Sequence, residues 1–176
     1  MNTQLILDTE IYNNITVGII PKAQKFLWIG TADIKDLYVK KGNKAVPFLE
    51  ILSDLIKKKV EIRLLFAKEP GDAFGNDFDK YPVLIKMLEQ FHCPRVHFKT
   101  VIVDGKYAYT GSANLTGAGM GMKSKNRRNF EAGILTSDEA FVEKLMKQFD
   151  DVWMGKNCKD CDRKIYCSEW KNILNK

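Results

Sequence analysis

Apolar and polar positions alternate with two different spacings along this chain of 176 residues. Residues 25–34 form an apolar, β-prone run, and residues 60–67 alternate before becoming wholly apolar, so both segments are predicted to be buried strands. Residues 47–59 lie between them and carry apolar side chains at helical spacing: Phe48, Leu49, Leu52, Leu55 and Ile56. A strand, a helix and a second strand in this order are typical of α/β proteins.

The second half of the chain combines the same two patterns. Strands are predicted over residues 96–103 and 106–110, and the Asp104-Gly105 pair between them is typical of a tight hairpin turn. A further strand is predicted over residues 129–136, followed by a helix over 137–154 with Ser137 as its N-cap. Because the hairpin requires antiparallel pairing and the first half favours parallel pairing, we expect a mixed β-sheet flanked by helices on both faces.

The remaining segments are less regular. Residues 11–24 suit a helix that Pro21 ends or bends, although the β-branched run at 15–17 would also suit a strand. A short amphipathic helix is predicted over residues 82–91. Loops are predicted at 69–81, at the glycine-rich and then basic segment 117–128, and around Lys40, Lys41 and Lys44.

Composition limits the class of protein. The length predicts one domain over residues 1–155, with a cysteine-containing tail, residues 156–176, packed on it. No apolar run reaches the ~18–20 residues of a membrane span, and Asp8 and Glu10 occupy the place of a basic secretory leader, so we expect a cytoplasmic protein. The net charge of +6 favours a polyanionic partner.

The most informative pattern is H-x-K-x4-D-x6-G-S-x-N, which contains His97, Lys99, Asp104, Ser112 and Asn114. An imidazole and an ammonium two residues apart on a strand point to the same face. That face would hold a nucleophile or proton carrier beside a fixed positive charge. This pairing suits attack on a phosphodiester, whose negative oxygens must be held while one bond replaces another.

The pattern resembles the HKD motif of the phospholipase D superfamily, in its Nuc/Zucchini-like nuclease branch. The resemblance implies an α-β-α sandwich and a phosphodiesterase that forms a phosphohistidine at His97. It also implies that Lys99 and Asn114 hold the non-bridging oxygens. Ser112 would steady the histidine or the phosphate, and Asp104 would order the site from the hairpin.

Nucleases of this superfamily carry an N-x-E segment one strand later, and Asn129-Phe130-Glu131 fits it. The resemblance implies that Glu131 orients His97. The family's reaction uses two histidines, but the chain contains the motif once, and its other histidine, His92, has no motif around it. The simplest arrangement is a homodimer in which each subunit contributes one His97 to a shared site. No cofactor is expected for catalysis.

Three substrate classes remain open from the sequence. Lys123, Lys125, Arg127 and Arg128 lie between the Asn114 turn and Glu131, where they would bind the phosphates of DNA or RNA. A phospholipase D or phosphatidyltransferase acting on lipids would usually carry two motifs or a membrane-associating segment. A non-catalytic scaffold that binds nucleic acid would typically show a degraded motif. The sequence therefore favours a metal-independent nuclease.

Four cysteines form a second cluster of candidate ligands. Cys158, Cys161 and Cys167 follow the pattern C-x2-C-x5-C, and a C-x2-C turn is typical of metal binding. Cys93, four residues before His97, is the expected fourth ligand of a structural metal. The set resembles both a four-cysteine zinc site and the iron–sulfur staple of RecB-like nucleases, and the sequence does not decide between zinc and a cluster.

Overall fold

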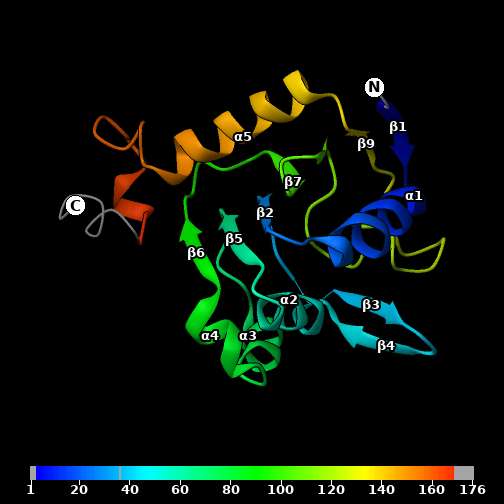
Figure 1. Cartoon of the computed structure of the whole chain (residues 1–176). Coiled ribbons are helices and arrows are strands. Elements are labelled where there is room, and N and C mark those ends of the chain that lie inside the picture. The colour runs from blue at the N-terminus through cyan, green and yellow to red at the C-terminus, as the bar shows by residue number, and fades with distance from the viewer. Residues whose placement is uncertain (1–2, 36, 169–176) are drawn as a thin grey trace.

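A mixed seven-stranded sheet forms the centre of the computed structural model, which describes residues 3–35 and 37–168 (Figure 1). The strand order is β1-β9-β8-β7-β2-β5-β6. β2 pairs in parallel with β5, and β5 with β6, whereas the other neighbours are antiparallel. The strands are β1 (Thr3–Leu7), β2 (Phe26–Thr31), β5 (Glu61–Phe66), β6 (Glu89–His92), β7 (Lys99–Val103), β8 (Tyr107–Gly111) and β9 (Ala132–Thr136). The predicted mixed sheet is confirmed.

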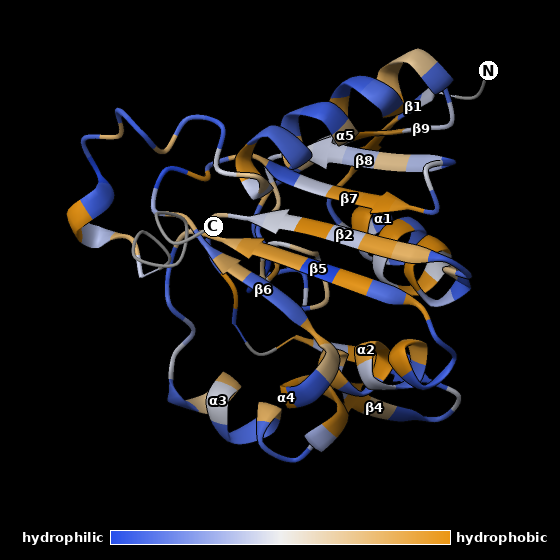
Figure 2. Cartoon of the chain, turned by 60° about the vertical axis from the view of Figure 1, so that its left-hand side comes forward, coloured by the Kyte–Doolittle hydropathy of each residue, from blue (hydrophilic) through white to orange (hydrophobic). Residues whose placement is uncertain are grey.

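Helices cover both faces of this sheet, as expected for an α-β-α sandwich (Figure 2). Val101 of β7 packs into a core with one set of helices, whereas its neighbour Ile102 packs into the core under α5 (Glu139–Trp153). The first set comprises α1 (Thr9–Ile11), η1 (Tyr12–Ile19), η2 (Ile20–Lys22), α2 (Phe48–Lys57), α3 (Asp72–Phe78) and α4 (Pro82–Met87). Among the described residues, no helix is long and apolar enough to cross a membrane.

Several element boundaries differ from the sequence prediction. The helical interpretation of residues 11–24 is correct and the strand alternative is wrong, because α1, η1 and η2 follow one another from Thr9 to Lys22. The segment 82–91 divides into α4 and β6, and α3 lies inside the predicted loop at 69–81. The N-cap of α5 is Asp138, whose carboxylate accepts a hydrogen bond from the Phe141 amide at 2.9 Å, so the prediction of Ser137 was wrong.

The segment around Lys40 is a hairpin instead of a loop. It consists of β3 (Tyr38–Lys41) and β4 (Lys44–Pro47). The ammonium of Lys41 lies 2.7 Å from carboxylate oxygens of both Glu50 and Asp54 on α2. Hydrogen bonds to Asp54 and Glu50 raise the pKa of Lys41. This lysine therefore fastens the hairpin to α2, and its charge is already balanced within the chain.

Candidate active site

The register of strands β2, β7 and β8 gathers the motif at one edge of the sheet. Lys99 opens β7 and pairs with Gly111, the last residue of β8, while Thr100 pairs with Gly30 near the end of β2. Segments that follow β8 and β2 therefore reach the point where β7 begins. This pairing places Ser112 next to the His97–Lys99 segment.

The His97 and Lys99 side chains are in contact, but His97 lies before the strand, because β7 begins at Lys99. Nζ of Lys99 lies 3.4 Å from Nδ1 of His97 and donates a hydrogen bond to the His97 carbonyl at 2.7 Å. Lys99 is only 8% exposed, whereas His97 is exposed. Since an ammonium can only donate, a hydrogen bond in this contact requires Nδ1 of His97 as the acceptor.

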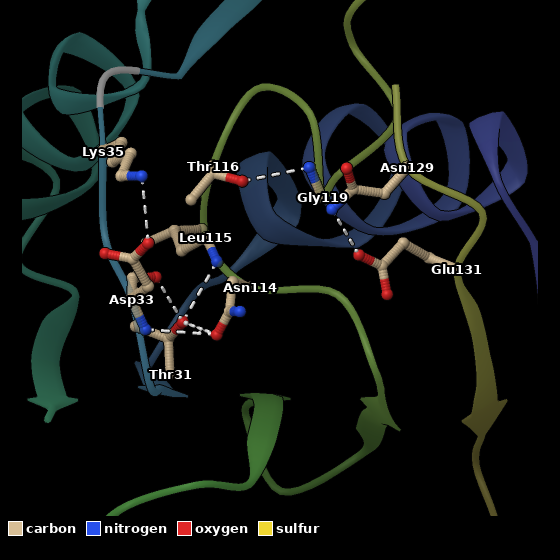
Figure 3. Close-up of polar contacts among 9 residues, drawn as sticks. All are labelled: Thr31, Asp33, Lys35, Asn114, Leu115, Thr116, Gly119, Asn129 and Glu131. Carbon is tan, nitrogen blue, oxygen red and sulfur yellow. Dashed lines mark hydrogen bonds and ion pairs between the residues drawn. The ribbon is translucent and has the colours of Figure 1, made fainter. Parts of the chain in front are cut away.

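Ser112 and Glu131 form a second polar group. Oγ of Ser112 donates to Oε2 of Glu131. The side-chain amide of Asn129 donates to Oε1 of Glu131 at 3.0 Å (Figure 3). The backbone amide of Ala132 donates to Oγ of Ser112 at 3.1 Å. Within the described residues, neither oxygen of Glu131 is hydrogen-bonded to His97, so its role in orienting that histidine stays a prediction.

Asn114 is held by two residues that the sequence did not single out. Its Oδ1 accepts a hydrogen bond from the Asp33 backbone amide at 3.1 Å and lies 3.4 Å from Oγ1 of Thr31 (Figure 3). That hydroxyl in turn accepts from the Leu115 amide at 3.0 Å. With Oδ1 occupied in this way, the Asn114 amide nitrogen has no partner among the described residues and can donate to a bound anion. In the sequence, these two residues were marked only by their place at the end of a predicted strand. Thr31 is the last residue of β2, and Asp33 follows two residues later.

Asp104 lies at the other end of β7, in the hairpin turn, and does not contact the site residues. It has a φ of +55° and Gly105 a φ of +66°, as in a type I′ turn. Its carboxylate accepts hydrogen bonds from the backbone amides of Gln24, Lys25 and Phe26, the shortest at 2.7 Å. Burial raises the pKa of Asp104, but these three amides outweigh it and hold the pKa below its usual value. Asp104 therefore fixes the start of β2 against the hairpin.

We expect Asp104→Asn to lower the free energy of unfolding by about 1–2 kcal/mol at pH 7, because a neutral amide accepts more weakly than a carboxylate. Asparagine tolerates the positive φ, so the turn is retained. Because the folded pKa is lowered, the carboxylate's contribution is present above about pH 4 and is lost as pH falls through the folded pKa. Denaturant titrations at pH 7 and pH 3 should show the two proteins converging in acid. An equal difference at both pH values would contradict this account.

The predicted phosphate-binding segment forms an exposed loop. Lys123, Lys125 and Arg127 are exposed and Arg128 is half-buried. A hydrogen bond from the Asn129 amide to the Ala118 carbonyl, 3.1 Å long, closes the loop. Through this closure the loop leads directly into the Asn129–Glu131 segment.

The predicted metal ligands lie next to the segment that leads to His97. Cys93, Cys158 and Cys161 line one pocket, whereas Cys167 donates a hydrogen bond to the His92 carbonyl at 3.5 Å. Among the described residues, no three side chains of the histidine, cysteine, aspartate or glutamate type are arranged to hold a single metal ion. Cys93 lines the same pocket as Cys158 and Cys161 of the tail, and its role as a metal ligand stays a prediction.

The fold and the motif are those of the phospholipase D superfamily. The family model for the cardiolipin synthase, PLD-like domain matches residues 17–153. The chain therefore belongs to the phospholipase D-like family, and the predicted membership is confirmed.

Individual relatives agree with this assignment. The chain is 25% identical to the mitochondrial cardiolipin hydrolase of Chlamydomonas reinhardtii over 105 residues, which are 59% of this chain but only 44% of that relative. Its fold is similar to Nuc from Salmonella typhimurium, with a TM-score of 0.60, 16% identity and coverage of 86% of this chain and 93% of Nuc. NucT from Helicobacter pylori gives a TM-score of 0.58 at 13% identity, with coverage of 85% and 95%. The archaeal chromatin protein TrmBL2 gives 0.59 at 14% identity, with coverage of 87% and 52%.

Proposed function

We propose that the chain is a metal-independent endonuclease that cleaves nucleic-acid phosphodiesters through a phosphohistidine, at a site shared across a homodimer. The observation that carries the proposal is the contact between the Lys99 ammonium and the His97 imidazole, 3.4 Å apart and beside Ser112. An exposed nucleophile is thereby held beside a fixed, buried cation. Asn114 supplies a further donor from its amide nitrogen.

In the first step, a ring nitrogen of His97 attacks phosphorus and the bond to the leaving oxygen breaks. Lys99 and Asn114 donate hydrogen bonds to the non-bridging oxygens, where negative charge develops. The leaving alkoxide takes a proton from a second imidazole. In the second step, that imidazole removes a proton from water, which attacks phosphorus and releases His97 with a phosphate monoester as product.

His92, the other histidine of this sequence, does not supply the second imidazole. His92 is held by Nε2, which lies 2.9 Å from the Ala67 carbonyl, and by Nδ1, which lies 3.0 Å from Oγ of Ser168. Both ring nitrogens therefore have partners, and the ring lies at the end of β6 instead of beside Lys99. A two-fold homodimer would supply the partner's His97 in its place.

Charge supports nucleic acid as the substrate. The loop with Lys123, Lys125 and Arg127 lies next to the Asn129–Glu131 segment, and the chain carries a net charge of +6. Such basic side chains bind phosphate backbones without regard to sequence. The name of the cardiolipin hydrolase relative supports the alternative, a lipid phosphodiester.

Labelled DNA, labelled RNA and cardiolipin-containing vesicles should be compared in EDTA. We expect cleavage of at least one nucleic acid and no release of phosphatidic acid. Lys123→Ala/Lys125→Ala/Arg127→Ala should weaken nucleic-acid binding and flatten its salt dependence, by about 0.9 in logarithmic slope for each phosphate that the variant no longer neutralises. Lys22→Ala/Lys57→Ala/Lys86→Ala removes the same charge elsewhere and is the matched control. Hydrolysis of the lipid alone would overturn the nuclease proposal.

A further inference from the structure

The C-terminal tail returns to the end of β6, beside the segment that leads to His97. The Trp153 ring at the end of α5 packs against Phe91 of β6, with ring centroids 5.8 Å apart. Further along, Ser168 contacts the His92 ring at 3.0 Å, and Cys167 donates to the His92 carbonyl. The tail therefore contacts β6 on both sides of the stretch that contains its three cysteines (Figure 1). Cys93 is the residue that follows β6 in the chain.

A pocket lies between the tail and this segment. Its volume is about 210 Å³, and its lining includes three thiols, those of Cys93, Cys158 and Cys161. Apolar side chains, including Val96 and Phe98, form part of the wall. Thiols are stabilised as thiolates once a metal cation lies among them.

Arg95 adds a positive charge to the same pocket. Its side chain is hydrogen-bonded with Cys161. A centre held by four thiolates carries net negative charge, which a guanidinium at its edge would offset. Thiols, an apolar wall and one cation together match the surroundings of a thiolate-bound metal centre.

We propose that the four cysteines hold such a metal centre and that it joins the tail to the β6–β7 connection. The volume of the pocket that Cys93, Cys158 and Cys161 line favours an iron–sulfur cluster over a single zinc ion. A single zinc ion would require the four sulfur atoms to move until each lies about 2.3 Å from the ion. A cluster spreads its four thiolate ligands over several iron atoms and fits a wider ring of thiols.

The centre would be structural, because its ligands lie apart from the groups that contact the phosphate. The Cys93 amide donates to the Phe66 carbonyl at 2.8 Å, and the Val96 amide donates to the Cys93 carbonyl at 3.0 Å. Cys93 thus begins a short turn that ends at Val96, directly before His97. A metal at Cys93 would fix this turn and the tail together, so its removal should lower thermal stability before it affects chemistry.

Metal content of the full chain, purified under anaerobic conditions, tests the proposal. An iron–sulfur centre predicts about four irons and four sulfides per chain with broad visible absorption. Zinc predicts about one ion per chain and no visible band, which would support the thiolate site but reject the cluster. Cys161→Ser should lose at least nine-tenths of the metal and unfold at a lower temperature. Lys159→Ser, an exposed substitution within the same turn, is the matched control and should retain the metal.

Two results would overturn the proposal. One is a wild-type chain that holds no iron or zinc as purified and takes up neither on anaerobic reconstitution, with its cysteines recovered as thiols or disulfides by mass spectrometry. This measurement needs no variant, so a misfolded mutant cannot obscure it. The other is a Cys93→Ser protein with full metal content, which would remove Cys93 from the ligand set.

Discussion

His97→Ala is expected to lower phosphodiester turnover by about 10⁴-fold or more. In a homodimer, this one substitution removes both the nucleophile and the group that protonates the leaving oxygen. Lys99 would keep its ammonium at the site, so substrate binding should fall far less than turnover. The measurement is single-turnover cleavage of labelled nucleic acid in EDTA, with binding measured separately on the same substrate.

The matched control is His92→Gln, which exchanges the other histidine of the chain. Its ring contacts Ala67 and Ser168 and is not part of the proposed chemistry, so activity should be retained even if stability falls. Rapid quenching of the wild type at alkaline pH should reveal a phosphorylated His97 by mass spectrometry, because phosphohistidine is destroyed by acid. Equal losses of activity in the two variants would contradict the assignment of His97 as nucleophile.

The elements that could be predicted from the sequence are those whose buried residues recur at one regular spacing, either that of a strand or that of a helix. β2, β5 and α2 are buried along a face or throughout, so their apolar positions alone specify the element. β1 was missed because only Ile6 of its five residues is buried, which leaves no alternation to detect. Its strand conformation depends on antiparallel pairing with β9, a partner more than 120 residues away.

The site shows the same division between local and tertiary information. The spacing of His97, Lys99 and Ser112 was sufficient to predict that they share a site, because the Asp104-Gly105 turn fixes the register of β7 against β8. The residues that hold the Asn114 side chain could not be predicted. Asn114 is held by Asp33 and Thr31, which belong to a different strand–loop segment. The antiparallel pairing of β2 with β7 and a bridge between Ile34 and Leu115 bring that segment near.

A heterodimer of one wild-type subunit and one His97→Ala subunit is expected to be nearly inactive. If the site is shared, a single His97 can attack phosphorus but no second imidazole protonates the leaving group, which costs about 10²–10⁴-fold. Two independent sites would instead leave half of the wild-type activity. Co-expression with two different affinity tags, followed by purification on both tags in turn, isolates the heterodimer for a direct rate measurement.

The same argument predicts the activity of unseparated mixtures. With random pairing of equal amounts of the two chains, about one quarter of the dimers contain two wild-type subunits, so activity should fall to about one quarter of the wild-type value. A mixture of wild type with His92→Gln should lose little activity and controls for effects of tagging and co-expression. Light scattering under assay conditions must show a dimer, and full turnover by a strictly monomeric sample would refute the shared site.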